Sequence, residues 1–230
     1  MSLIRHLPNT LTICNLLCGC VGIAFLLEGP PYYAIWFVIA ACVFDFFDGF
    51  AARMLKVSSA IGKELDSLAD MVTFGFYPAL YTFQSLKEFG HPWLHYLAFL
   101  LAVSSAIRLA KFNVDERQTD GFIGLATPAN ALFIFSFPYL FRLTGLDDFG
   151  ATGPIIVTLL FSWLMVSPIR LFALKFKHFG WKGNELKFTF LAISVLLIAF
   201  FQAAGLALAI ITYILLSLFD GWRRAGTVHN

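Results

Sequence analysis

Residues 45–70 read DFFDGFAARMLKVSSAIGKELDSLAD, and they hold five of the fourteen acidic residues of the chain. This stretch joins two apolar runs, 32–52 and 63–84, so its aspartates fall where one run ends and the next begins. A helix that crosses a bilayer needs ~20 mostly apolar residues, which both runs supply. The stretch therefore predicts two transmembrane helices joined by a short turn, with carboxylates gathered at the turn.

The rest of the chain is equally apolar. Its 230 residues are 59% hydrophobic and 13% charged, with a mean hydropathy of +0.79. A soluble domain cannot bury that much apolar surface, so the composition predicts a membrane protein. About eight runs are long enough to span: 10–28, 32–52, 63–84, 92–110, 126–142, 150–167, 187–203 and 204–220. We expect an all-α, polytopic helical bundle forming one membrane domain over residues 1–230.

Two boundaries of these runs carry specific expectations. Asn9 follows Pro8 just before the first run, where we expect it to act as the N-cap of the helix. Gln202 to Gly205 separates the last two runs, so we expect a very short turn there.

The basic residues are distributed unevenly between the two sides. With both termini on one side, every lysine and arginine except Lys87 and Arg142 falls on that side. The positive-inside rule then predicts that both termini are cytosolic and that the number of spans is even. The expected location is the cytoplasmic (inner) membrane, with residues 45–70 at its cytosolic face.

Helical spacing brings the carboxylates together. Asp45 and Asp48 are three residues apart near the end of the second run, so they share a helix face. Asp66 and Asp70 are four apart at the start of the third run and also share a face. Two helices joined by a short turn can point these faces at each other. The sequence thus predicts four carboxylates around one small volume.

Small residues extend both acidic faces. Gly49 and Ala52 continue the face of the second run, and Gly62 lies one turn before Asp66. Carboxylates near hydrocarbon persist when they are paired or bind a metal. Hard divalent cations such as Mg²⁺ or Mn²⁺ suit oxygen ligands, and the small residues leave room for a phosphate or nucleotide. The alternatives are a solvated acidic loop, or salt bridges between the helices that involve Arg53, Lys56 and Lys63.

The spacing of these residues resembles the signature of the CDP-alcohol phosphatidyltransferase family. The matching pattern is Asp45-x2-Asp48-Gly49-x2-Ala52-Arg53-x8-Gly62-x3-Asp66-x3-Asp70. Further segments resemble the phosphatidylserine synthase branch of the family: Pro8 to Asn15, Ser67 to Pro78, Arg108 to Asn113, and Gly124 to Ala129. The resemblance runs from the first apolar run through the fifth, and only hydrophobicity is recognisable beyond about residue 175.

The resemblance implies roles for the residues of the signature. It implies that Asp45, Asp48, Asp66 and Asp70 bind two divalent ions, Mg²⁺ or Mn²⁺, and that Asp70 also acts as general base. It further implies a binding site for CDP-diacylglycerol formed by Gly49, Ala52, Arg53 and Gly62. The implied reaction converts CDP-diacylglycerol and L-serine into phosphatidylserine and CMP, in a protein that forms a homodimer.

The second substrate would need a cation for the serine carboxylate. Arg108, Lys111 and Arg170 lie at cytosolic ends of predicted helices and are the candidates, with ordinary positive-inside anchoring as the alternative. Asn113 and Thr127 are weaker candidates.

One more polar residue falls inside an apolar run. Asn15 lies in the first run, where it either hydrogen-bonds between helices or lines the nucleotide site.

Three other functions fit part of the pattern. The same family includes enzymes with other acceptors, such as glycerol phosphate or inositol phosphate, which would need a further basic cluster. An intramembrane prenyltransferase also uses paired aspartate motifs, but these lie far apart in the chain. A divalent-cation transporter would place its site near the midplane on broken helices. The aspartates here lie near one face, which favours the transferase.

Overall fold

The computed structural model describes residues 5–29, 31–57, 59–114, 121–145, 150–174 and 180–227. Its main helices are α2 (Leu7–Glu28), α3 (Ala34–Leu55), α4 (Ala60–Asp70), α5 (Tyr77–Lys87), α6 (Phe99–Val114), α7 (Thr127–Thr144), α8 (Thr152–Val166) and α9 (Glu185–Thr227). Arg117, Lys175 and Lys177, which contribute to the charge asymmetry, lie outside the described residues.

The predicted helical fold is confirmed, and each of the eight apolar runs coincides with helix. Four segments are long and apolar enough to cross a membrane by length and composition: Leu7–Glu28, Pro31–Leu55, Leu94–Val114 and Glu185–Arg223. The expectation for Asn9 was wrong, because α2 begins at Leu7 with His6 as its N-cap residue. Pro8 explains the earlier start, since proline is well suited to the first turn of a helix.

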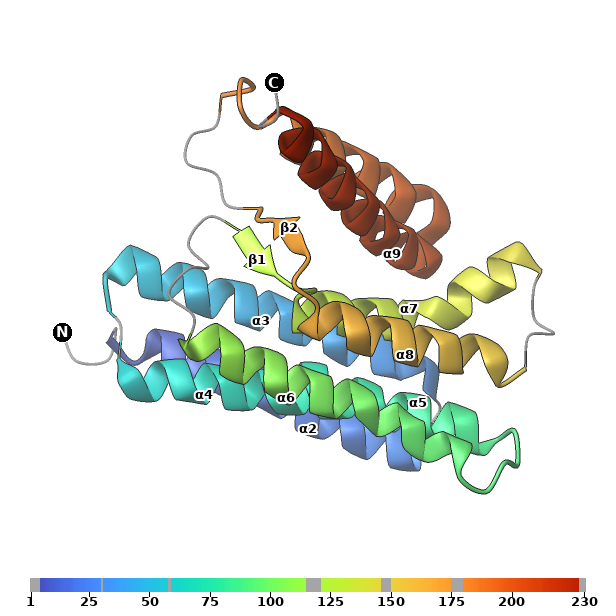
Figure 1. Ribbon diagram of the computed structural model, residues 1–230. Coiled ribbons are helices and arrows are strands. Elements are labelled where there is room, and N and C mark those ends of the chain that lie inside the picture. The colour runs from blue at the N-terminus through green and yellow to red at the C-terminus, as the bar shows by residue number, and fades with distance from the viewer. Residues whose placement is uncertain are drawn as a thin grey trace.

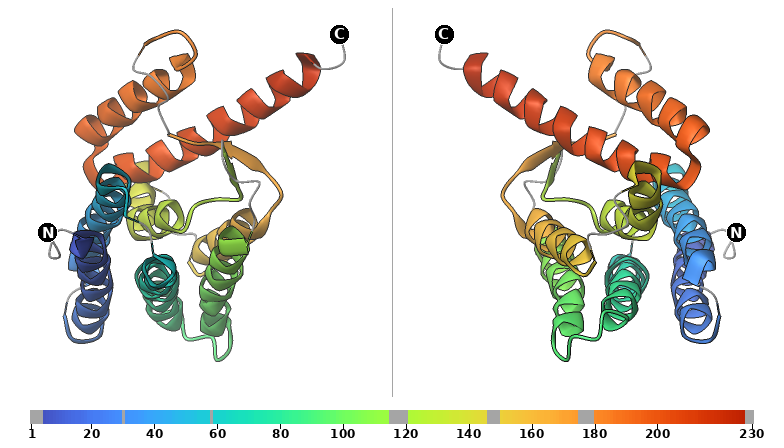
Figure 2. Two further views of the ribbon diagram at one scale, coloured as in Figure 1. Left: turned by 90° about the vertical axis from the view of Figure 1, so that its left-hand side faces the viewer. Right: turned by 90° about the vertical axis from the view of Figure 1, so that its right-hand side faces the viewer.

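The helices α2 to α8 form a bundle whose axes run in roughly the same direction (Figure 1). Seen along the bundle, α2 and α3 form one side, α4 with α5 lies in the middle, and α6 with α8 forms the other side (Figure 2). The contacts agree with this view, because α2 packs on α3 and α4, and α6 packs on α8. The aromatic residues Phe74, Tyr77 and Phe135 are fully buried between α2, α3, α5 and α7.

Successive connections alternate between the two ends of the bundle. The N-terminus, the α3–α4 turn and the end of α6 lie together at one end, which we call the acidic end (Figure 1). The turn after α2, the end of α5 and the end of α7 lie at the opposite end, which we call the far end. This alternation is the arrangement that the charge asymmetry predicted for the described segments.

A π-helical segment, Met71–Phe76, joins α4 to α5 without a break in the helix. Pro78 follows it within the first turn of α5. Proline lacks a backbone N–H and clashes with the carbonyl four residues before it, so a widened turn relieves the conflict. The third apolar run is therefore one long helix, and Asp70 is the last residue before its widened part.

Two features complete the fold beside α7. The strands β1 (Gly121–Ile123) and β2 (Arg170–Phe172) pair antiparallel, an addition that the sequence did not predict. The last helix, α9, folds back on itself at Gln202, where φ is 50° and ψ is −122°. This confirms the short turn expected there. The two arms of α9 lie across one side of the bundle and contact α7 and β2 (Figure 2).

Candidate metal and nucleotide site

The four aspartates come from two helices that meet at a tight turn. Asp45 and Asp48 lie in the second half of α3, and Asp66 and Asp70 lie on α4. The chain leaves α3 through Lys56, which adopts the left-handed conformation with φ 50°. The reversal brings the acidic face of α4 alongside that of α3, as the spacing predicted.

The start of α4 is capped by a side chain. The Ser59 hydroxyl accepts a hydrogen bond of 2.9 Å from the Gly62 backbone N–H. This satisfies one of the four free donors at a helix N-terminus and fixes where the helix begins. The phase of α4, and hence the direction of its aspartates, follows from that start.

Three of the carboxylates form a tight group. One oxygen from each of Asp45, Asp48 and Asp66 lies within 4.8 Å of the others. Asp70 lies beside this trio, with its carboxyl in hydrogen-bonding reach of Asp45. Like charges this close repel strongly in a poorly hydrated site, so the group requires protons or a cation to balance it. The structure thus brings together all four predicted residues, with Asp70 at the edge of the group.

Donors from α2 hold two of these carboxylates. Thr12 Oγ1 donates to Asp48 Oδ2 at 2.6 Å, and Asn15 Nδ2 donates to Asp70 Oδ1 at 3.2 Å. Asn15 is fully buried, and its backbone carbonyl accepts a hydrogen bond of 3.1 Å from Thr73 Oγ1. Asn15 therefore hydrogen-bonds between helices, which is one of the two roles that the sequence suggested for it. The role of Thr12 was missed, although its position three residues before Asn15 puts both on one face.

The close packing of α2 depends on glycine. A Cβ atom on Gly19 would lie 3.0 Å from the Thr73 Cα and would meet its hydroxyl. Only a residue without a side chain permits this approach, which keeps α2 near α4 and the π-helical segment. Thr12 and Asn15 can reach the aspartates because of it.

A pocket of about 580 Å³ opens beside the trio at the acidic end. Its lining residues are Arg5, His6, Pro8, Asn9, Thr12, Asp48, Gly49, Ala52, Val57, Ser59, Ile61, Gly62, Lys63 and Asp66. This volume is within the usual range of ligand sites, roughly 300–1,000 Å³. Three of the four residues predicted to bind the nucleotide, Gly49, Ala52 and Gly62, line it.

The glycines keep parts of this pocket open. A Cβ on Gly62 would lie 3.0 Å from both Asn9 Oδ1 and Ser59 Oγ. Arg53, the fourth predicted residue, is not a lining residue, but its guanidinium lies beside Gly49, 3.4 Å from the place of a Cβ. It is also close enough to attract the Asp48 carboxylate. The Arg53 guanidinium thus lies next to the α3 residues that line the pocket.

Sequence reasoning missed the cations in the wall of this pocket. Arg5 and Lys63 line it together with His6. Arg5 and His6 lie just before Pro8-Asn9, separated from them by Leu7 alone, but a cation at a helix start is also ordinary positive-inside anchoring. The pocket therefore has a carboxylate group on one side and basic side chains on another, which suits a metal-bound diphosphate.

The three candidates for serine binding differ in the structure. Arg108 on α6 is only 7% exposed, and its Nε has no hydrogen-bond partner among the described residues. It is close enough to Asp70, and to Tyr213 on α9, to interact with both electrostatically. Lys111 and Arg170 are exposed. The structure thus brings Arg108 toward the aspartates, and it gives Lys111 and Arg170 no such contact within the described ranges.

The two weaker candidates for serine binding differ as well: Asn113 bonds between helices, and Thr127 is buried. Asn113 Nδ2 donates to Ser67 Oγ at 2.8 Å, and the backbone carbonyl of Asn113 accepts from Lys63 Nζ at 2.6 Å. Asn113 therefore links α6 to α4. Thr127 is fully buried, and its hydroxyl has no partner among the described residues. The side chain of Asn130, one turn later, is also buried with no hydrogen-bond partner among the described residues, and no sequence pattern singled it out.

Comparisons with known proteins agree with this geometry. A family model described as CDP-alcohol phosphatidyltransferase matches residues 5–167, which include all four aspartates and the pocket. The chain is 35% identical over 178 residues to the CDP-diacylglycerol–serine O-phosphatidyltransferase of Bacillus subtilis (strain 168). That match covers 76% of this chain and 92% of the relative.

Two further relatives carry the same name. One, from Mycobacterium tuberculosis (strain ATCC 25618 / H37Rv), is 37% identical over 139 residues, covering 56% of this chain and 47% of the relative. The other, from Saccharomyces cerevisiae, is 33% identical over 153 residues, covering 60% of this chain and 55% of the relative. In these two the matched region is about half of the relative. With the aspartate spacing realised in space and the family model spanning the bundle, the chain belongs to the CDP-alcohol phosphatidyltransferase family.

Proposed function

We propose that this chain is a CDP-diacylglycerol–serine O-phosphatidyltransferase, which makes phosphatidylserine and CMP from CDP-diacylglycerol and L-serine. The observation that carries the proposal is the carboxylate trio at the wall of the 580 Å³ pocket, in a chain whose relatives bear this name. The whole reaction would belong to one membrane domain over residues 1–230.

The trio fits a divalent cation. Its donors are all carboxylate oxygens, which Mg²⁺ and Mn²⁺ prefer, and Asp66 Oδ1 is buried without a hydrogen-bond partner among the described residues. Asp45, Asp48 and Asp66 would hold two such ions, with Asp70 contributing at the edge. When bound, these ions neutralise the charge of the diphosphate. The carboxylates would hold these ions beside the pocket, where the diphosphate would bind.

The pocket fits the nucleotide end of the lipid substrate. Gly49, Ala52 and Gly62 leave space for the cytidine diphosphate group, and Arg53 supports this wall. Arg5 and Lys63 are placed to attract phosphate oxygens. The acyl chains would remain in the bilayer, since the pocket lies at the end of helices that are long enough to cross it.

Asp70 is suited to be the general base. The hydroxyl oxygen of serine attacks the phosphorus that carries diacylglycerol, the bond from that phosphorus to the CMP oxygen breaks, and the hydroxyl proton passes to Asp70. A base must have an oxygen in reach of that proton. Asn15 donates to Asp70 Oδ1 and so fixes the direction of the carboxyl at the edge of the trio.

Arg108 is the best candidate for the serine carboxylate. It is a buried guanidinium near Asp70 with an unused donor at Nε, and guanidinium groups bind carboxylates in a fixed geometry. Lys111 and Arg170 are exposed and would act further out, where serine enters. One buried cation suits the carboxylate of serine better than a phosphorylated acceptor, which would need several.

The setting of the enzyme is also part of this proposal. The acidic end would face the cytosol from the cytoplasmic (inner) membrane, because the basic residues concentrate at that end. Serine would enter the site directly from the cytosol, and CMP would leave the same way. A homodimer is expected from the family resemblance.

An assay of acceptor use tests the proposal. Purified protein is given CDP-diacylglycerol with labelled serine, glycerol phosphate or inositol phosphate, each with Mg²⁺ or Mn²⁺. We expect phosphatidylserine and CMP in equal amounts from serine alone. Turnover with another acceptor and not serine would retain the family and overturn the choice of substrate. Metal uptake into liposomes without any turnover would favour a transporter.

A further inference from the structure

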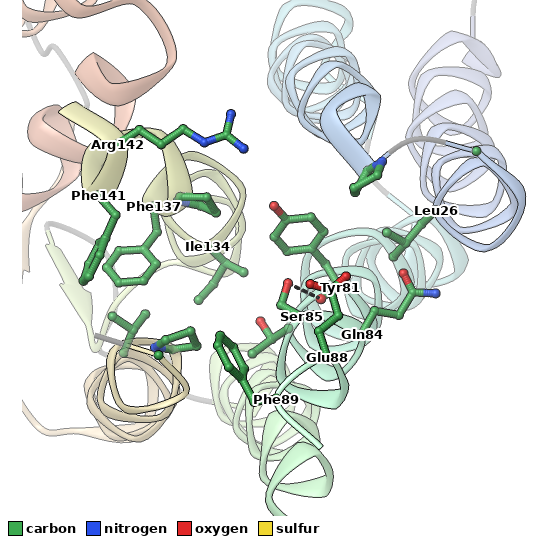
Figure 3. A pocket seen from close by; sticks show the side chains of 17 residues that line it. Leu26, Tyr81, Gln84, Ser85, Glu88, Phe89, Ile134, Phe137, Phe141 and Arg142 are labelled. Carbon is green, nitrogen blue, oxygen red and sulfur yellow. Dashed lines mark hydrogen bonds between the residues drawn. The ribbon is translucent and has the colours of Figure 1, made fainter. Parts of the chain in front are cut away.

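A second pocket lies at the far end of the bundle, between α2, α5, α7 and α8 (Figure 3). Its volume is about 540 Å³. Leu26 lines this pocket and Thr12 lines the nucleotide pocket, and both are on α2. Because each helical residue rises ~1.5 Å, the two pockets are roughly 20 Å apart along α2. The far pocket is thus separate from the proposed catalytic site.

One wall of the far pocket is apolar. Ile134, Phe137 and Phe141 of α7 form it, with Val157 of α8 and Leu26 of α2 completing the apolar surface. Figure 3 shows Ile134 directed toward the space in front of α5, whereas Phe137 and Phe141 point toward α8, where their rings approach Gly153. Such a wall suits the hydrocarbon part of a ligand, since burying apolar area is favourable by ~25 cal/mol per Å².

The other wall is polar and comes from α5. It presents Tyr81, Gln84, Ser85 and, at the end of the helix, Glu88 (Figure 3). The Ser85 hydroxyl is already bonded to the Tyr81 carbonyl at 3.1 Å. The Tyr81 hydroxyl has no hydrogen bond among the described residues. A ligand with polar atoms would therefore find a free phenol on this wall.

Two opposite charges face this pocket from different helices. Glu88 follows α5, and Arg142 is in the last turn of α7. Both are close enough to the Tyr81 hydroxyl to act on it electrostatically. No ion pair joins Glu88 to Arg142 in the part of the chain that the structure describes. A cation and an anion thus share the opening of one pocket, with no direct ion pair between them among the described residues.

We propose that this pocket binds the head group of a zwitterionic phospholipid from the membrane leaflet opposite the acidic end. The lipid phosphate would face Arg142, and its ammonium group would face Glu88. The glycerol and the first part of the acyl chains would lie along Phe137 and Phe141. The volume suits this portion of a lipid, because roughly 300–1,000 Å³ is typical of sites for small molecules.

The combination of features selects this ligand class over two simpler ones. An anionic lipid without an ammonium group would satisfy Arg142 and be repelled by Glu88. A soluble zwitterion would satisfy both charges and leave the apolar wall uncovered. The pocket also lies where α2 and α3, two helices that can cross the membrane, end and begin. Phospholipid head groups are located at that depth.

The test measures lipid retention by native mass spectrometry of delipidated protein in detergent. The protein is titrated with phosphatidylethanolamine, with phosphatidylglycerol of the same chains, and with soluble glycerophosphoethanolamine. We expect phosphatidylethanolamine to bind about tenfold more tightly than phosphatidylglycerol, which corresponds to one charge-assisted contact. The soluble head group should bind much more weakly than either lipid.

Two substitutions and a control locate the site. Arg142→Gln should weaken both lipids, and Glu88→Gln should remove the roughly tenfold preference for phosphatidylethanolamine, because it weakens binding of that lipid and no longer repels phosphatidylglycerol. Lys87→Gln, a neighbouring exposed lysine outside the pocket lining, should change neither. Glu88 and Arg142 are both exposed, so their substitution leaves the core intact. Equal retention of the two lipids by the unmodified protein, or an unchanged preference in Glu88→Gln, would overturn the proposal.

Discussion

The four aspartates of the acidic end lie close together in the sequence, whereas the residues around Arg108 come from distant parts of the chain. At the acidic end, the four aspartates come from α3 and α4, two helices that follow each other. Arg108 lies on α6, and its electrostatic neighbours are Asp70 on α4 and Tyr213 on α9. Tyr213 also lies beyond residue 167, where the family match ends. Local spacing reveals the first region, whereas only the folded chain reveals the second.

This difference suggests that the two regions have separate roles in the reaction, which substitutions can test. The acidic end would carry the chemical step, so changes there should lower kcat. The Arg108 region would hold the acceptor, so changes there should raise the KM for serine.

The largest effect is expected from Asp70→Asn. Removing a general base costs about 10²–10⁴ in rate, and we expect about a thousandfold loss of kcat. Circular dichroism and gel filtration should show a folded protein, because asparagine keeps the shape and can still accept from Asn15. Glu64→Gln is the matched control, since Glu64 is an exposed carboxylate on the same helix outside the group. Activity near that of the unmodified protein in Asp70→Asn would remove Asp70 as the base.

Metal binding should be visible without turnover. Saturating Mn²⁺ should raise the melting temperature of the protein by about 5–10 °C, as expected for a ligand at roughly a hundred times its Kd. Asp66→Asn removes one ligand of the trio and should abolish most of that rise. In the absence of metal, the same variant should be at least as stable as the unmodified protein, because it relieves repulsion between carboxylates. A rise that is equal in both proteins would place the ion elsewhere.

The contrast between the two regions also explains what sequence could predict. The spacing of Asp45, Asp48, Asp66 and Asp70 predicts their convergence because two adjacent helices leave little freedom in how their faces meet. The bonds from Thr12 and Asn15 depend instead on how α2 approaches, which Gly19 sets through packing rather than through a recognisable motif.

The remaining features could not be predicted, for physical reasons. The three-residue strands β1 and β2 are held by a partner 47 or more residues away, and neither has a sequence pattern long enough to indicate a strand. Tyr213 and Arg108 come within electrostatic range of each other because the chain folds back at Gln202 of α9. Long-range packing of this kind leaves no periodic signal in one sequence.

A smaller loss of activity is expected from Thr12→Val. Valine keeps the shape of threonine and removes the 2.6 Å hydrogen bond to Asp48, which orients one ligand of the trio. We expect kcat to fall about tenfold and the Mn²⁺ concentration for half-maximal activity to rise, since a hydrogen bond to a charged group contributes ~1.5–3 kcal/mol.

The control for that variant is Thr158→Val. Thr158 is also buried and also bonds the carbonyl of a proline four residues earlier, at 2.7 Å, as Thr12 does at 3.1 Å. It differs in having no described bond to an aspartate, so its substitution should leave metal dependence unchanged. Equal effects of the two substitutions would mean that Thr12 acts only through helix packing.

The smallest effect, and the most informative for the second region, is expected from Tyr213→Phe. The Tyr213 hydroxyl donates to the Phe172 carbonyl of β2 at 2.8 Å and lies within electrostatic range of Arg108. Removing it frees the phenyl ring to shift and takes a dipole away from the guanidinium. We expect the KM for serine to rise about fivefold, the equivalent of ~1 kcal/mol, with kcat and the KM for CDP-diacylglycerol unchanged.

Tyr77→Phe separates this positioning role from a loss of stability. Tyr77 is fully buried, and its hydroxyl donates to the Ala34 carbonyl at 3.1 Å. Its substitution therefore removes the same type of hydrogen bond, but at the start of α3, which lies at the far end of the bundle. Both variants should lower the melting temperature by a similar amount, and only Tyr213→Phe should change the KM for serine. If the two variants behave alike in serine kinetics, α9 stabilises the bundle without shaping the acceptor site, and the acidic end alone determines catalysis.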